Sequence, residues 1–105
     1  MRERHVIVHS SVIREWLGRK NVPLDRDGIE RALRKINAVI NTFGDDVVVV
    51  EESPDTGFVS LPGRVGVGNS ARLYGARAGT CLVIAREVLE KAGIPVSLDE
   101  EAVLP

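Results

Sequence analysis

VVVVEESPDTGFVSL, residues 47–61, is the stretch on which the fold class depends. Four consecutive valines, Val47 to Val50, are typical of a central strand that is covered on both faces. The segment 53–57 (SPDTG) has turn chemistry, and Phe58 to Leu61 then has the composition of a partner strand. The stretch therefore predicts two strands that are joined by a turn.

The residues before this stretch predict one strand and two helices. His5 to His9 is β-branched and predicts a first strand, after which Ser11 can cap a short helix that ends near Gly18. Asp27 and Glu30 have capping-box spacing and open a longer helix that Gly44 closes. The apolar stripe of this helix recurs at helical spacing and consists of Ile29, Leu33, Ile36, Ile40 and Phe43.

The residues after it predict one more helix and one more strand. Thr80 to Lys91 is strongly helical, although the helix could begin either at Ser70 or at Thr80. Ile94 to Leu98 predicts a last strand, and Pro95 favours an edge position because proline cannot donate a ladder hydrogen bond.

This order of elements indicates the fold class. It predicts a single α+β domain over residues 1–105, with a four-stranded antiparallel sheet and two main helices. The arrangement is the split β-α-β-β-α-β order, called ferredoxin-like, with one short extra helix. Because this architecture carries many unrelated functions, the fold alone says little about chemistry.

Composition limits the cellular setting. The chain has 105 residues, enough for one hydrophobic core, and one cysteine, Cys81, which has no partner for an internal disulfide. No apolar run approaches the ~20 residues that cross a bilayer, and the first residues do not fit a signal peptide. We expect a cytoplasmic protein that does not contact a membrane.

The charges of the chain are separated along the sequence. Thr56 to Arg86 holds four arginines and six of the ten glycines but no Asp, Glu or Lys. The remainder has ten basic and fifteen acidic residues. Glycine lets backbone N–H groups approach a ligand, and arginine binds phosphate or carboxylate through two hydrogen bonds. The basic, glycine-rich third therefore predicts an anion-binding surface.

The predicted site lies between Gly63 and Thr80, and its expected ligand is a phosphorylated small molecule or a nucleotide that is bound without being transformed. Gly66 to Ala71 has the spacing of a G-x-G-x-x-A phosphate loop, but the surrounding pattern does not fit a dinucleotide fold. The candidate ligand-binding residues are Arg64, Gly66, Gly68, Asn69, Ser70, Arg72, Tyr74 and Arg77.

Two other classes of function remain open. If the long helix exists, Ala71, Gly75 and Gly79 form a small-residue face that suits a self-assembling homo-oligomer, in which opposite charges would pair between subunits. A nucleic-acid-binding module is the second alternative. A GxxG run, residues 63–66, and the basic side of the first long helix favour it, whereas a pI near 6.1 and few aromatic residues disfavour it.

No catalytic or metal-binding set stands out in the sequence. His5 and His9 lie four residues apart, which on a strand is too far for one metal ion, although either could contact a ligand at the end of the strand. Cys81 fits a buried structural position. We therefore assign no catalytic residue, no metal and no cofactor, and leave enzyme activity open.

Overall fold

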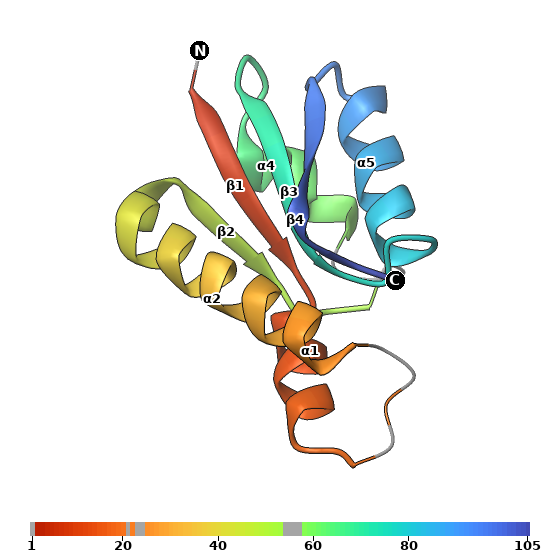
Figure 1. Cartoon of the computed structure of the whole chain (residues 1–105). Helices are drawn as coiled ribbons and strands as arrows, with labels where there is room; N and C mark the ends of the chain where they lie inside the picture. Colours follow the sequence, from red (N-terminus) through yellow and green to blue (C-terminus); the bar gives the residue numbers. More distant parts are fainter. Residues whose placement is uncertain (1, 21, 23–24, 54–57) are drawn as a thin grey trace.

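The structure is a computed structural model that describes residues 2–20, 22, 25–53 and 58–105. In this part of the chain, helices and strands alternate (Figure 1). The elements in chain order are β1 (Glu3–Val8), α1 (Ser10–Leu17), α2 (Arg26–Phe43), the 3₁₀ turn η1 (Gly44–Asp46), β2 (Val47–Val50), the 3₁₀ turn η2 (Phe58–Ser60), α4 (Leu61–Val65), β3 (Ser70–Ala76), α5 (Cys81–Lys91) and β4 (Val96–Leu104).

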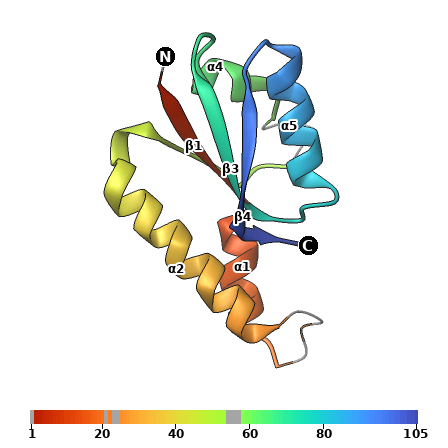
Figure 2. The same ribbon diagram turned by 45° about the horizontal axis from the view of Figure 1, so that its top comes forward.

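The described strands form one parallel sheet in the order β2-β1-β3-β4, and all arrows in Figure 1 point the same way. His5 of β1 is in register with Val47 of β2 on one side and with Arg72 of β3 on the other. Helices cover both faces of the sheet, as Figure 2 shows. The sheet is therefore the middle layer of three.

Two apolar cores lie on the two faces of this sheet. Val6 and Val8 of β1 point into a core that α4 and α5 close, whereas Ile7 points into a core that α1 and α2 close. Because successive side chains of a strand point to opposite faces, a central strand in a three-layer protein must be apolar at every position. Val6, Ile7 and Val8 are all fully buried, which matches this requirement.

The prediction of an antiparallel, ferredoxin-like sheet is wrong, because Phe58 to Leu61 is not a strand. The segment forms η2 and the start of α4. Phe58, Leu61 and Val65 are buried at spacings of three and four residues, which is the period of a helix. The chain thus crosses to the other side of β1 before the next strand begins. The predicted turn at residues 53–57 lies largely outside the described residues.

The third strand comes from the glycine-rich segment. Ser70 begins β3, so a helix starting at Ser70 is excluded, and α5 begins at Cys81 with Thr80 as its N-cap residue. Ala71 and Leu73 face the α5 core, while Tyr74 and Ala76 face the α2 core. Ala, Leu and Arg favour helices in isolation, but the neighbouring strands β1 and β4 override this preference.

Both edges of the sheet are partly closed. β2 is an edge strand rather than the predicted central one, and the Arg64 guanidinium donates to the Val49 carbonyl oxygen at 2.7 Å. β4 lies at the other edge, as Pro95 led us to expect, and its pairing with β3 shifts register between Leu73 and Gly75. Bulged or covered edges resist pairing with other chains.

The broader prediction of a mixed helix-and-sheet protein is confirmed. None of the helices in residues 2–20, 22, 25–53 and 58–105 is long and apolar enough to cross a membrane.

Candidate functional site

The order of the strands identifies one end of the sheet as the place to look for a site. After β1 the chain passes over the α1–α2 face to β2, and from β2 it passes over the opposite face to β3. The helix α5, which follows β3, lies on that same opposite face. The chain therefore leaves β1 and β3 toward opposite faces, and a crevice opens between the two connections. In open parallel sheets, ligands bind in such a crevice at the carboxyl ends of the strands.

The first residue after each of these two strands has an unusual backbone. His9 follows β1 with φ 55°, and Arg77 follows β3 with φ 66°. These two are the non-glycine residues with positive φ in the described part of the chain. Left-handed backbone costs a residue with a Cβ atom about 1 kcal/mol or more, and such strain is commonest at functional sites.

A hollow of about 310 Å³ lies at this end of the sheet. We call it the switch-point hollow, and it is lined by His9, Val12, Glu51, Ser53, Arg77 and Cys81. These residues come from the ends of all three strands β1, β2 and β3 and from the first turns of α1 and α5.

Arg77 supplies positive charge to the switch-point hollow. Its side chain is exposed and forms no ion pair within the described part of the chain. Its carbonyl oxygen accepts from the amides of Thr80 and Leu82, which fixes the loop that leads into α5. Among the described residues, the amides of Gly79 and Cys81 have no backbone acceptor, so the start of α5 presents N–H groups beside this arginine.

Glu51 supplies negative charge on the other side. Its carboxylate accepts from the Ser10 hydroxyl at 2.7 Å, from the Ser11 amide at 3.3 Å and from the Ser11 hydroxyl. These groups form the amino end of α1. Burial raises the pKa of Glu51, but the hydrogen bonds from Ser11 and Ser10 outweigh it, so the pKa is lowered and the carboxylate stays ionised.

His9 and Cys81 are the buried members of the lining. His9 Nε2 lies 2.8 Å from the Glu52 carbonyl oxygen, and since a carbonyl only accepts, Nε2 carries the proton. Cys81 is 6% exposed and begins α5, and its Sγ lies 3.9 Å from the Thr80 hydroxyl. A hollow that combines an arginine with the amino end of a helix can hold an anionic group.

The structure separates the residues predicted to bind the ligand into several groups. Gly66, Gly68, Asn69 and Ser70 form the turn at the amino end of β3, far along the strand from Arg77. The Asn69 amide side chain donates to the Val65 carbonyl oxygen at 2.9 Å and accepts from the Arg2 amide at 3.2 Å. A Cβ atom on Gly66 would lie 2.9 Å from Asn69 Nδ2. These contacts give the glycines a structural role in the turn.

Arg64 belongs to α4, and its side chain reaches β2. It covers the β2 edge and its Nη1 is 4.0 Å from Glu52. Of the predicted arginines, only Arg77 lines the switch-point hollow.

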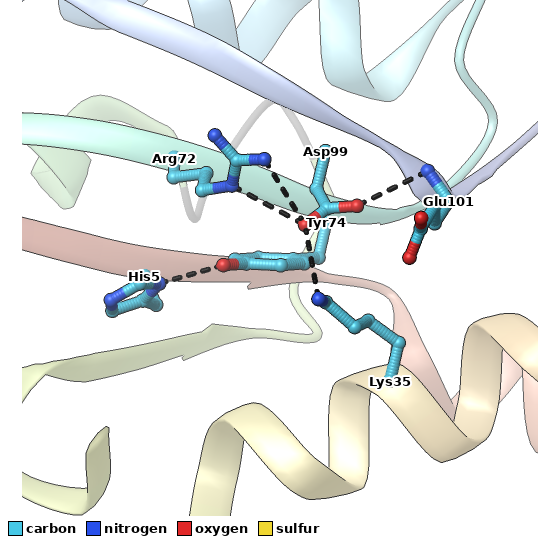
Figure 3. A network of polar contacts seen from close by, with 6 residues as sticks. All are labelled: His5, Lys35, Arg72, Tyr74, Asp99 and Glu101. Atoms are coloured by element: carbon cyan, nitrogen blue, oxygen red, sulfur yellow. Dashed lines mark hydrogen bonds and ion pairs between the residues drawn. The ribbon is translucent and has the colours of Figure 1, made fainter. Parts of the chain in front are cut away.

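Arg72 and Tyr74 belong to a polar network between the sheet and α2 (Figure 3). Arg72 donates from Nε and Nη2 to Asp99 Oδ2, each at 3.3 Å, and Lys35 of α2 lies 4.0 Å from the same oxygen. Burial lowers the pKa of Arg72, but the hydrogen bonds to Asp99 outweigh it and raise the pKa. The buried Asp99 is thus neutralised within the protein.

The same network contains a buried pair of aromatic residues. His5 Nδ1 and the Tyr74 hydroxyl lie 2.7 Å apart, and the Phe43 ring stacks on His5 with centroids 4.0 Å apart. Burial lowers the pKa of His5 and raises that of Tyr74 to about 12. Tyr74 therefore lies in a core and is not available to stack on a ligand.

Sequence reasoning missed Glu51, Ser10 and Ser11 as members of a site. The signal that could have found them is polar residues directly after two apolar strand runs, HSS after HVIV and EES after VVVV. In the structure β1 and β2 are parallel neighbours, so these residues meet at one end of the sheet, whereas in the predicted split order another strand would separate the first two strands. No cluster of three or more metal-ligating side chains occurs among the residues that the structure describes.

Comparisons with models of protein families, with curated proteins and with solved structures found no match to this chain. A function can therefore be proposed only from the residues of the site.

Proposed function

We propose that this protein binds a phosphorylated small molecule or a nucleotide in the switch-point hollow, without transforming it. The observation that carries the proposal is Arg77, which forms no ion pair with another described residue and lies beside the amino end of α5, in a hollow at the carboxyl ends of the central parallel strands. Arginine and helix-terminal amides together favour phosphate over neutral ligands. The proposal keeps Arg77 from the sequence prediction and moves the site to the residues around it.

The chemistry of the lining favours binding rather than catalysis. His9 Nε2–H is committed to the Glu52 carbonyl oxygen, and the Glu51 carboxylate is held by Ser10 and Ser11. Within the described part of the chain, no hydrogen bond joins His9 to the Cys81 thiol, so the lining holds no paired base and nucleophile. A reducing, cytoplasmic setting is part of the proposal, because Cys81 has no second cysteine to pair with.

Native mass spectrometry of the purified full chain, followed by denaturation, tests whether a phosphorylated molecule travels with the protein. Isothermal titration with inorganic phosphate and with adenosine monophosphate then tests the site in the wild type and in Arg77→Ala. We expect Arg77→Ala to weaken binding roughly tenfold or more, as loss of a charge-assisted hydrogen bond to phosphate does.

Arg86→Ala is the matched control for this experiment. It also removes one positive charge, but Arg86 pairs with Glu90 within α5 and does not line the switch-point hollow. Equal affinity of Arg77→Ala and the wild type for both probes would contradict the proposal, as would equal losses in the two variants.

Self-assembly is the second candidate function, and one observation favours it. A hollow of about 530 Å³ runs along α5 and β4, and it is lined by Ala78, Leu82, Val83, Arg86, Glu87, Glu90, Lys91 and Leu98. Val83 and the neighbouring Ile84 are 43% and 38% exposed. Apolar side chains rimmed by charges of both signs suit a second copy of this chain. Light scattering of the wild type and of Val83→Lys would show whether an oligomer exists and dissociates.

The predicted small-residue face does not contribute to such an interface. Ala71 and Gly75 lie in the buried strand β3, not on a helix. The basic side of α2 gives no clear support to nucleic-acid binding either, since Glu100 and Glu101 line the same hollow as Arg31, Arg34 and Lys35.

A further inference from the structure

A hollow of about 680 Å³ lies between α2 and the second half of β4. Arg31 and Arg34 of α2 line it together with Glu100 and Glu101 of β4, and we call this surface the α2–β4 face. These four residues are exposed, and none of them forms an ion pair with another described residue. We propose that the α2–β4 face binds a second copy of this chain in a symmetric dimer.

The signs of the charges select this partner. A polyanion such as a nucleic acid would be repelled by the two glutamates, and a strongly basic partner by the two arginines. In a dimer with two-fold symmetry, the same patch of both copies meets, so that residue i contacts j and j contacts i. A patch with equal numbers of arginines and glutamates then complements itself, because the arginines of each copy face the glutamates of the other.

A bulge in β4 holds the acidic half of the face in place. Leu98 and Val103 lie five positions apart in β4 but pair with residues only two positions apart in β3. Such a bulge turns side chains out of the regular ladder. Its support is the buried Asp99, which accepts from the Glu101 amide at 3.1 Å and from Arg72 Nη2 at 3.3 Å (Figure 3). The exposed carboxylates of the bulge are therefore presented on an ordered backbone.

The basic half of the face comes from one turn of α2. Arg31 and Arg34 are three residues apart and are therefore neighbours on the surface of the helix. Lys35 lines the same hollow but already forms an ion pair within the network of Figure 3. Val103 and Leu104, which are partly buried, add apolar area to the hollow. Apolar area with a charged rim is the usual composition of a protein interface.

The α2–β4 face is a separate surface. Among the described residues, it shares no lining residue with the hollow along α5 or with the switch-point hollow. Dimerisation through it requires no ligand, so it can be tested independently of the proposed function. Because bulged edge strands resist strand addition, the two copies would meet through side chains rather than through one continuous sheet.

Sedimentation equilibrium of the full chain tests for this dimer. We expect the wild type to dimerise at about 0.1 M NaCl and to dissociate toward about 1 M, because the Debye length falls from about 10 Å to about 3 Å. An acidic variant carries Arg31→Glu and Arg34→Glu, and a basic variant carries Glu100→Arg and Glu101→Arg. Each should weaken dimerisation roughly a hundredfold or more, since like charges then face each other at every contact.

Mixing the two variants gives the most specific readout. When one chain of the acidic variant meets one chain of the basic variant, every contact again joins opposite charges. We expect the equimolar mixture to form a dimer of roughly wild-type affinity, although neither variant dimerises alone. A variant that had merely unfolded would not regain a partner in this way.

Arg19→Glu with Arg26→Glu is the matched control for the acidic variant. It changes the net charge by the same amount, but these arginines pair with Glu15 and Glu30 and do not line the α2–β4 face. It should change the affinity of the dimer by less than about threefold, because exposed ion pairs contribute little.

Four results would overturn the proposal. They are a wild type that stays monomeric at low salt, a mixture of the two variants that does not dimerise, a dimer that persists in each variant alone, and equal losses in the acidic variant and its control. If the dimer persists in both variants but dissociates in Val83→Lys, the contact lies on the hollow along α5 instead.

Discussion

The carbonyl oxygen of Val8 lies 1.9 Å from the position that a Cβ atom would take on Gly75. The two residues are in register at the carboxyl ends of β1 and β3, next to His9 and Arg77. Gly75 also has φ 128°, a conformation that residues with a Cβ atom rarely adopt. The close approach of the two central strands beside the switch-point hollow thus requires glycine at this position.

Gly75→Ala should therefore destabilise the fold severely. The atom that the new Cβ meets belongs to the backbone of a central strand, which can move only if the sheet separates. We expect a loss of about 3 kcal/mol or more in the free energy of unfolding, measured by urea denaturation. Since small domains have about 5–15 kcal/mol in total, this loss would remove about a fifth or more of the stability.

Gly63→Ala is the control for this substitution. Gly63 lies in α4, and a Cβ atom there would have no heavy atom within 4 Å. Alanine in a helix is favoured over glycine, so the stability should stay the same or rise by up to ~1 kcal/mol. Similar losses in the two variants would contradict the steric explanation.

This contact also shows why the direction of the strands could not be predicted from local patterns. Periodicity and capping signals gave β1, α1, α2, β2 and α5 nearly in place, since each depends on neighbouring residues. Whether β3 runs parallel to β1 depends on a crossover between distant residues. The turn chemistry of residues 53–57 favoured a hairpin, and the helical spacing of Phe58, Leu61 and Val65 was the opposing signal.

The error in the fold displaced the site. With parallel strands, His9, Glu51 and Arg77 all follow carboxyl ends and line one hollow. The prediction of the site rested on the glycine and arginine content of one segment, and of these three residues it included only Arg77. Amino-acid content does not show which residues come together in the fold. Gly75, read as part of a flexible or helical segment, is required instead by the backbone of β1.

Tyr74 allows a direct optical test of its environment. It is the only tyrosine of the chain, so the absorbance of tyrosinate near 295 nm reports this residue alone. Burial raises its pKa to about 12, whereas a tyrosine in denaturant titrates near 10. We expect the folded protein to titrate about two pH units above the denatured chain. A midpoint near 10 while circular dichroism still shows the native fold would refute the buried position.

The stability of the protein should fall on mild acidification because of His5. Its pKa in the folded protein is lowered by burial, so between the folded value and the unfolded value of about 6.5 the unfolded chain binds more protons. Its contribution is therefore present above about pH 6.5 and lost as the pH falls below it. The slope can reach at most about 1.4 kcal/mol per pH unit.

Urea denaturation between pH 5 and pH 7.5 measures this slope. His5→Gln retains a polar group near Tyr74 but does not titrate, so its stability should vary less with pH than that of the wild type. Parallel curves for the two proteins over this range would show that His5 is not the responsible group.

Because Arg72 and Asp99 form an ion pair, we expect the losses of stability caused by substituting each residue to be non-additive. Arg72→Ala leaves the Asp99 carboxylate, which is 4% exposed, with Lys35 at 4.0 Å as its nearest cation. We expect a loss of roughly 2 kcal/mol in the free energy of unfolding, because a buried charge loses two hydrogen bonds. Asp99→Asn removes the charge, so adding Arg72→Ala to it should cost much less, about 0.5 kcal/mol.

The double-mutant cycle by urea denaturation should therefore give a coupling energy above about 1 kcal/mol. Additive losses would mean that the two side chains are solvated separately, and Arg72 would then again be free to bind a ligand at the amino end of β3.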